Sequence, residues 1–437
     1  MSTPRAIMPA PAKLSLRVLS ESDVRRVHEA ALELLAGDAD AAVEALAHAP
    51  SVVALVGRVP EHDVALGDGS SRLAPGSLGA PATTVQPLGG GDPRPAVAAD
   101  LDDACRLADA LPEVALVAGP PVCGEGTGTL AALARCLAAT TKHVVAVAVR
   151  TAAEARAAIR LAEAVTGSPD SRPLSLCAGL EGRDAVTVAA AAGLCTGLVL
   201  APGGPDRVGR DLATALVRHH AGVLSGCAAV QREAPGAPFL YVAAPAFASL
   251  PAAGPVAAVF QIAATQLAAH VGLPVIAAGM ATGSHDSDWQ ACTQNAFASL
   301  STTAARAHVT AGAGTLAGGA TFSLRQLVMD AEIYSWNAAI AAGVPVDQET
   351  IALGAIEDVG IGGNFLSQRH TRRHMRDVWR PRLLDRSMWD AWVASGREGA
   401  AEKATAFARQ LLAEHEVVPL PDQVRATVER IVAEAGL

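Results

Sequence analysis

The chain has 437 residues and a formal net charge of -9, with 51% hydrophobic residues but only 3% aromatic ones. The acidic balance and the scattered Lys and Arg residues argue against a nucleic-acid partner, because surfaces that follow phosphates need clustered cations. The N-terminus has no continuous apolar segment and the longest apolar run is interrupted by Gly and Pro, so we expect a cytoplasmic protein without a targeting signal or a membrane span.

The first part of the chain is typical of an extension rather than of a domain. A capping-box pattern at residues 20–23 precedes the amphipathic run VRRVHEAALELLA, which predicts a helix. Residues 57–98 are rich in Gly, Pro and Asp and show little periodicity. We therefore assign residues 1–75 to an N-terminal helical extension and residues 76–437 to one domain with C-terminal helices.

A repeated pattern of short apolar run, Gly/Pro-rich loop and Ala-rich helical stretch fills most of the chain. Near-continuous apolar strands are buried on both faces, as in a parallel sheet, and their spacing leaves room for one helix each. The clear runs are VALVAG, HVVAVAV, PLSLCAG, GLVLAPG, PFLYVAA, PVIAAGM and HVTAGAG. With a weaker eighth run near IGGNFL, they predict an α/β fold of the (β/α)8 TIM-barrel type. An open doubly wound sheet is the alternative, disfavoured because no Gly-x-Gly-x-x-Gly follows the first strand.

The seven cysteines are an odd number and form no Cys-x-x-Cys pair. Most stand in apolar contexts such as LSLCAG, which indicates buried free thiols in a reducing compartment rather than disulfides. We expect no metal site.

Polar chemistry is concentrated in the stretch GMATGSHDSDWQ, residues 279–290, directly after the run PVIAAGM. No Asp, Glu, Lys or Arg occurs between Glu233 and Asp286. Because the active sites of α/β barrels lie in the loops at the C-terminal ends of the strands, we interpret this stretch as part of the site.

The last third of the chain carries three blocks: LPVIAAGMATGSHDSDWQA, GGATFSLRQLVMDAEI and VGIGGNFLSQRHTRRHMRDVWRPRLLDRSMWDAW. Together they resemble the trimethylamine methyltransferase family of corrinoid-dependent enzymes, in the branch that lacks pyrrolysine and includes the glycine betaine methyltransferases. Earlier stretches such as LSESDVRRVHEAALELL are also similar, so the resemblance spans nearly the whole chain.

The resemblance implies an enzyme that moves a methyl group from a small N-methylated, here quaternary, amine to the Co(I) corrinoid (cobalamin) of a separate protein. A quaternary methyl group is transferred by in-line attack and leaves a neutral amine, so no general acid is strictly required and the protein mainly orients its substrate. The expected partners are thus the amine and the corrinoid protein, and a homo-oligomer is also expected. The alternatives are a diverged barrel enzyme that works without cobalamin, and a homologue that only binds.

The chain departs from the family pattern at two places. The stretch APAFASLPAAGPVAA, residues 244–258, has no formal charge where many relatives carry charged residues. The family's Leu-Asp-Asp-Glu pattern becomes Met-Asp-Ala-Glu at residues 329–332, one carboxylate short. The identity of the methyl donor is therefore left open.

Side chains in the polar loop have competing interpretations. Trp289 could give a bound cation a cation–π contact worth roughly 0.5 to 2 kcal/mol, or it could pack at the start of the helix WQACTQNAFASL. Asp286 and Gln290 are candidates for contact with the substrate. Asp288 is the better candidate for the helix N-cap, because the helix starts directly after it.

Two histidines are candidates for a catalytic role. His285 stands where several relatives have Lys, and could be a hydrogen-bond donor or a titrating contact. His370 ends a loop that runs into a helix, and its spacing from His374 also fits zinc, but no further ligand pattern accompanies the pair. The same loop supplies further candidates for substrate binding: Asn364, Phe365 and Gln368.

Two more candidates for substrate binding come from the block before the C-terminal region. Phe322 follows a Gly-Gly pair at a predicted strand end, and either lines the pocket or packs. Glu332 could face a cationic ligand, although a mid-helix Glu is more often solvated or ion-paired.

Overall fold

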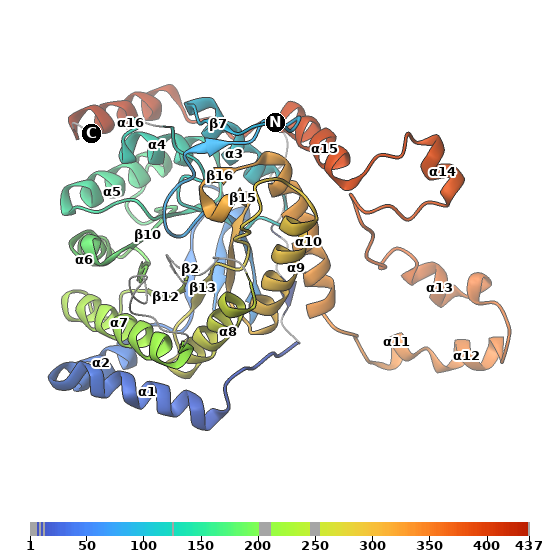
Figure 1. Cartoon of the computed structure of the whole chain (residues 1–437), viewed down its shortest axis with the longest axis horizontal. Coiled ribbons are helices and arrows are strands. Elements are labelled where there is room, and N and C mark those ends of the chain that lie inside the picture. The colour runs from blue at the N-terminus through green and yellow to red at the C-terminus, as the bar shows by residue number, and fades with distance from the viewer. Residues whose placement is uncertain are drawn as a thin grey trace.

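The computed structural model describes residues 7, 10–11, 14–124, 126–200, 211–244 and 254–435. Eight parallel strands form one sheet in the order β5-β14-β13-β12-β11-β10-β9-β8. A parallel bridge between Leu73 and Val114 joins the two end strands, so the sheet closes into a (β/α)8 barrel (Figure 1). The strands are β5 (Leu73–Pro75), β8 (Leu116–Ala118), β9 (His143–Ala146), β10 (Leu174–Ala178), β11 (Thr196–Leu198), β12 (Phe239–Ala243), β13 (Val275–Ala277) and β14 (Val309–Ala313). The barrel prediction is confirmed, and each of the seven clear apolar runs overlaps a strand.

The eighth strand lies elsewhere than predicted. Near IGGNFL the chain forms a turn and the short 3-10 helix η5 (Phe365–Ser367) instead of a strand. Strand β5 takes that place and pairs in parallel with β14. It is only three residues long and follows the buried Arg72, whose charge is paired with Asp68, so its sequence lacks an apolar run. This strand falls within the segment that the sequence assigns to the N-terminal extension.

One helix follows each barrel strand and packs on its outer side. These helices are α3 (Ala98–Ala110), α4 (Thr129–Ala139), α5 (Ala152–Thr166), α6 (Arg183–Ala191), α7 (Leu212–Glu233), α8 (Pro255–His270), α9 (Trp289–Ala304) and α10 (Leu324–Ala341). Two N-terminal helices, α1 (Glu21–Leu35) and α2 (Ala39–His48), pack against α7 (Figure 1). The predicted capping box is present, because the hydroxyl of Ser20 accepts a hydrogen bond from the N–H of Asp23 (3.1 Å).

The barrel has two apolar layers that are built mainly from small side chains. The outer layer lies between the strands and the helices. The inner layer fills the barrel with residues such as Cys177, Val242 and Ile276, together with the hairpin β2 (Val53–Leu55) and β3 (Val64–Leu66). Because the carbonyl of Val56 meets the ring of His143 at the start of β9 (2.9 Å), the hairpin closes the N-terminal end of the barrel. The open end for a ligand is thus the C-terminal one.

A small sheet ties two loops together at the C-terminal end. The chain after β5 supplies β6 (Thr84–Val85) and β7 (Arg94–Pro95), and the chain after β14 supplies β15 (Thr315–Leu316) and β16 (Thr321–Phe322). Strand β16 pairs in parallel with β6. The loops after β5 and β14 are therefore held as one unit beside the loop after β13.

The C-terminal third leaves the barrel and returns to it. Residues 343–399, here called the arm, carry α11 (Gln348–Ile351), α12 (Leu353–Val359), α13 (Arg369–His374) and α14 (Trp389–Ala394). Figure 1 shows the arm extending beyond α10, before α15 (Ala400–Glu414) packs on α10 and α3 and α16 (Asp422–Glu434) packs on α5. None of the helices in the described residues is long and apolar enough to cross a bilayer. The seven cysteines are free thiols, five of them buried.

Candidate active site

The loop between β13 and α9 forms the rim of the barrel's C-terminal end, where the sequence predicted functional residues. Asp288 caps α9, since its carboxylate accepts hydrogen bonds from the N–H of Ala291 (2.9 Å) and the hydroxyl of Ser284 (2.8 Å). Partial burial opposes ionisation, but these hydrogen bonds outweigh it and hold the pKa of Asp288 below its ordinary value. The prediction that Asp288 is the N-cap is confirmed, which leaves Asp286 for other contacts.

Asp286 is held by its own loop, by the segment after β6 and by the first turn of α10. Its Oδ1 accepts hydrogen bonds from the side-chain amide of Gln86 (2.6 Å) and the N–H of Ser287 (2.7 Å), and it forms an ion pair with Arg325. The Asp286 side chain is 60% exposed, whereas that of Arg325 is 12% exposed. Oδ1 makes all three contacts, so Oδ2 is left without a hydrogen bond from the described residues. The network fixes the orientation of one exposed carboxylate oxygen.

The sequence did not point to Gln86 or Arg325. Gln86 lies in the aperiodic segment after β6, and its backbone N–H pairs with the carbonyl of Phe322 (2.9 Å). Arg325 stands in the first turn of α10, after the N-cap Ser323. The only available signal was the isolated charge of Arg325 within a mostly apolar block.

Trp289, His285 and Gln290 are all exposed on this rim. Trp289 is the first residue of α9, and 81% of it is open to solvent. Packing at the start of the helix, one of its two predicted roles, is therefore not what the structure shows. An exposed indole on this face is available to a ligand or a partner.

Phe322 and Glu332 lie in the interior rather than on the rim. Phe322 is buried in β16 and packs so closely on Gly314 that an added Cβ there would lie 2.7 Å from the ring. Glu332 is buried on α10, where its carboxylate accepts hydrogen bonds from the N–H groups of Arg382 (2.7 Å) and Leu383 (3.2 Å). Glu332 thus anchors the returning end of the arm, and both residues have structural roles in this conformation.

The remaining candidates lie on the arm. Asn364 accepts a hydrogen bond from the N–H of Leu366 (2.8 Å) and so begins η5, while Phe365 is exposed. The ring of His370 lies 4.5 Å from that of His374, and Gln368 precedes α13. Figure 1 shows α13, which carries His370, on the part of the arm that extends beyond α10 and away from the barrel.

A buried carboxylate that the sequence left unassigned supports the rim from below. Asp330 accepts hydrogen bonds from the amides of Asn295 and Gln326 and from the N–H of Gly314, each 2.8 Å long. Burial raises the pKa of Asp330 to about 7, although these three donors favour its charged form. The residue connects α9, α10 and the loop after β14.

Part of the rim lies outside the described residues. Residues 201–210 and 245–253 belong to the loops after β11 and β12. The uncharged stretch APAFASLPAAGPVAA, in which the sequence predicted a divergent pocket wall, falls mostly within the second of these loops.

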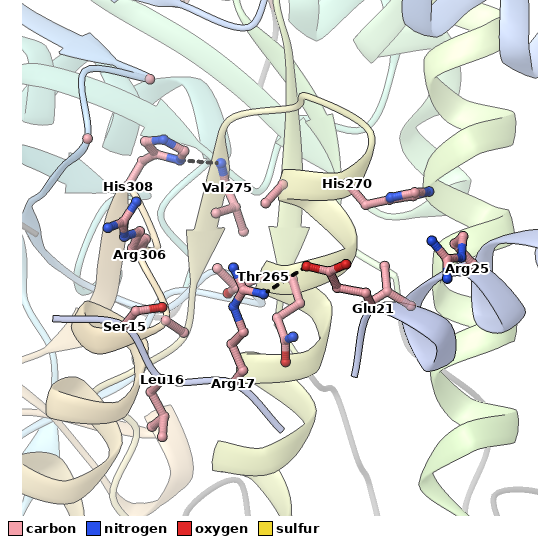
Figure 2. A pocket seen from close by; sticks show the side chains of 16 residues that line it. Ser15, Leu16, Arg17, Glu21, Arg25, Thr265, His270, Val275, Arg306 and His308 are labelled. Atoms are coloured by element: carbon pink, nitrogen blue, oxygen red, sulfur yellow. Dashed lines mark hydrogen bonds and ion pairs between the residues drawn. The ribbon is translucent and has the colours of Figure 1, made fainter. Parts of the chain in front are cut away.

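A large cavity lies at the opposite end of the barrel. It measures about 590 Å³ and is lined by side chains that include Arg17, Glu21 and Arg306 (Figure 2). Its wall contains the first residue of β13, Val275, whose N–H donates to the ring of His308 (3.0 Å). Because barrel enzymes act at the C-terminal ends of their strands, this cavity is separate from the candidate site.

Comparison with known proteins identifies the family. A family model described as trimethylamine methyltransferase (MTTB) matches residues 210–435, which is more than half of the chain and includes the β13–α9 loop, α10 and the arm. The chain belongs to the trimethylamine methyltransferase family. The predicted family is thereby confirmed.

Individual relatives are named trimethylamine or glycine betaine methyltransferases. Trimethylamine methyltransferase MttB of Desulfitobacterium hafniense is 28% identical over 411 residues, which cover 90% of this chain and 82% of that protein. MttB of Methanosarcina barkeri is 35% identical over 229 residues, which cover 51% of this chain and 46% of that protein. A glycine betaine methyltransferase of Desulfitobacterium hafniense is 31% identical over 233 residues, or 48% of its length. The last two matches thus span about half of each relative.

Proposed function

We propose that this chain transfers a methyl group from a small quaternary amine to the Co(I) corrinoid of a partner protein. The observation that carries the proposal is the family match over residues 210–435, because it contains the polar rim at the end of the barrel where such folds place their chemistry. The names of the relatives, which refer to trimethylamine and glycine betaine, agree with a small methylated amine as donor.

The rim offers the kind of contacts that a quaternary ammonium group needs. Such a cation has no N–H to donate, so a protein recognises it through aromatic faces and nearby negative charge. Trp289 presents an exposed indole, and Asp286, three residues earlier, presents a carboxylate oxygen in a fixed orientation. The positive charge of Arg325 offsets the negative charge of Asp286 on the rim. Recognition of a cation by shape and by the aromatic face is therefore favoured over simple charge attraction.

The reaction makes few demands on acid–base groups. The cobalt nucleophile attacks the methyl carbon in line with the C–N bond, which breaks as its electron pair returns to nitrogen, and a tertiary amine leaves without taking up a proton. The contribution of this chain is therefore to hold the amine in one orientation and to exclude water from the transfer path. Both the methyl acceptor and the donor are substrates in this scheme.

A single-turnover experiment tests the proposal. The protein is mixed with a partner corrinoid protein reduced to Co(I) and with choline, glycine betaine or tetramethylammonium in turn, and mass spectrometry follows the amine. The proposal predicts loss of one methyl group from one donor, in proportion to the corrinoid present. As a control, 3,3-dimethyl-1-butanol has the shape of choline without its charge and should neither bind nor react. A donor that binds but stays intact would indicate a binding-only homologue.

A further inference from the structure

The arm is almost entirely without a core of its own. Among its 57 residues, 343–399, only Leu383 is buried. Its helices α11 to α14 have four to seven residues each, whereas isolated helices shorter than about 12 residues are marginal in water. A segment of this kind needs an external surface to hold its conformation.

Many exposed side chains of the arm are charged, but a large number are apolar. The apolar ones include Val344, Val346, Ile351, Leu353, Ile356, Ile361, Leu366, Met375, Val378, Met388 and Trp389. Together they expose on the order of 1,000 Å² per copy, more than the few hundred Å² of a usual monomer patch and close to the roughly 800 Å² that each partner contributes to a standard interface. The area is sufficient for a stable dimer.

An apolar groove continues from the root of the arm. The groove measures about 470 Å³ and lies between α9 and α10, with Phe297, Ile333, Trp336 and Ile340 in its walls and Leu384 of the arm at its edge. Phe297 is 71% exposed. The groove therefore meets the arm at Leu383 and Leu384, on the outer side of α10.

The charges of the arm are divided between its two halves. Residues 347–358 contain four carboxylates and no Lys or Arg, whereas residues 369–386 contain seven Arg and two Asp. Within one chain the two halves share a single Arg–carboxylate ion pair among the described residues, Arg373 with Glu349 (2.5 Å). Glu357 and Arg372 form no ion pair in the part of the chain that the structure describes. A second copy related by a two-fold axis, with the two arms antiparallel, would set each acidic half against a basic half.

We propose that the arm is a dimerisation element that packs across the α9–α10 groove of a second copy, with the acidic half of one arm against the basic half of the other. A second copy would bury the exposed apolar side chains of the arm and would also present opposite charge to both of its halves. An acidic partner protein would match only the basic half and leave residues 347–358 without a complement.

Charge reversal and its rescue test the proposal by sedimentation velocity at 1 to 50 µM. Wild type should be a dimer. E357K/D358K and R372E/R376E should each weaken the dimer at least tenfold, because like charges then face each other. The quadruple variant should restore the dimer to within about threefold. E429K on α16 and R156E on α5, which reverse exposed charges outside the arm, should have no effect.

Hydrogen exchange provides a second readout that does not depend on variants. Amides of the arm should become protected as the concentration rises from 0.2 to 50 µM, while those of α16 should not change. A monomeric wild type at 50 µM, a dimer that survives both reversals, or a quadruple variant that stays monomeric would each overturn the proposal. Capture of an acidic corrinoid protein by the arm of a monomeric chain would overturn it as well.

Discussion

Asp330→Asn isolates the energetic consequence of the buried carboxylate beneath the candidate site. The folded chain raises the pKa of this carboxyl from 3.8 to about 7, chiefly because burial penalises the charged form. Folded protein therefore binds more protons than unfolded chain between about pH 4 and pH 7. Its stability should fall as the pH rises through this window, and the loss should be complete above pH 7.

The magnitude of the effect follows from the pKa difference. A difference of about three corresponds to at most about 4 kcal/mol, of which roughly 3 kcal/mol develops between pH 5 and pH 8.5. Asparagine has the same shape and does not titrate. It can also keep three hydrogen bonds, because the buried Oδ1 of Asn295 and Oε1 of Gln326 have no donor in the described structure. If the side-chain amides of Asn295 and Gln326 both rotate by half a turn, Nδ2 of the new asparagine donates to their oxygens. Its Oδ1 then accepts from the N–H of Gly314.

Scanning calorimetry at pH 5, 7 and 8.5 measures the predicted effect. For a chain of this length, 1 kcal/mol corresponds to roughly 1 °C in Tm, so the Tm of D330N should gain about 3 °C on wild type between the two extremes. D184N, which changes an exposed carboxylate on α6, should show no such pH-dependent gain. A constant difference at all three pH values, or a D330N protein less stable than wild type at pH 8.5, would show that burial of the charged Asp330 carboxylate does not limit stability.

Two further substitutions test the rim. W289A removes one cation–π contact and should weaken binding of tetramethylammonium by roughly 2- to 30-fold, measured by calorimetric titration. W289F keeps an aromatic ring and should keep most of the affinity. Unchanged binding by W289A would show that Trp289 is not part of the site. G312A should lower the free energy of unfolding by about 2 kcal/mol more than G91A does. Both glycines have positive φ, 109° and 105°, but only at Gly312 would a Cβ meet the carbonyl oxygen of Met280, at 2.4 Å. Equal losses in chemical denaturation would contradict this close approach.

The barrel could be predicted because its strands are buried on both faces and therefore read as continuous apolar runs. Strand β5 could not, since it has three residues and follows the charged Arg72. What defines β5 is its pairing with β14, more than 200 residues away. The local periodicity of the sequence does not reveal pairing between residues that lie so far apart in the chain.

The candidate site was predictable only where its chemistry is local. Asp288 was recognisable as a cap because it directly precedes the helix that it caps. The partners of Asp286 were not, because Gln86 and Arg325 stand 200 and 39 positions away and meet it only after the loops fold together. For the same reason a carboxylate that looked free for a cation turned out to share its charge with an arginine.

Methyl transfer to cobalt changes the visible spectrum of the corrinoid, which makes the proposed reaction directly observable. The purified protein is mixed with a reduced Co(I) corrinoid protein and a panel of N-methylated amines, with a second methyltransferase as control that the cobalt is competent. We expect the Co(I) spectrum to convert to that of methyl-Co(III) with one quaternary donor. A spectrum that stays unchanged across the whole panel, while the control enzyme methylates the same cobalt, would contradict the proposed reaction.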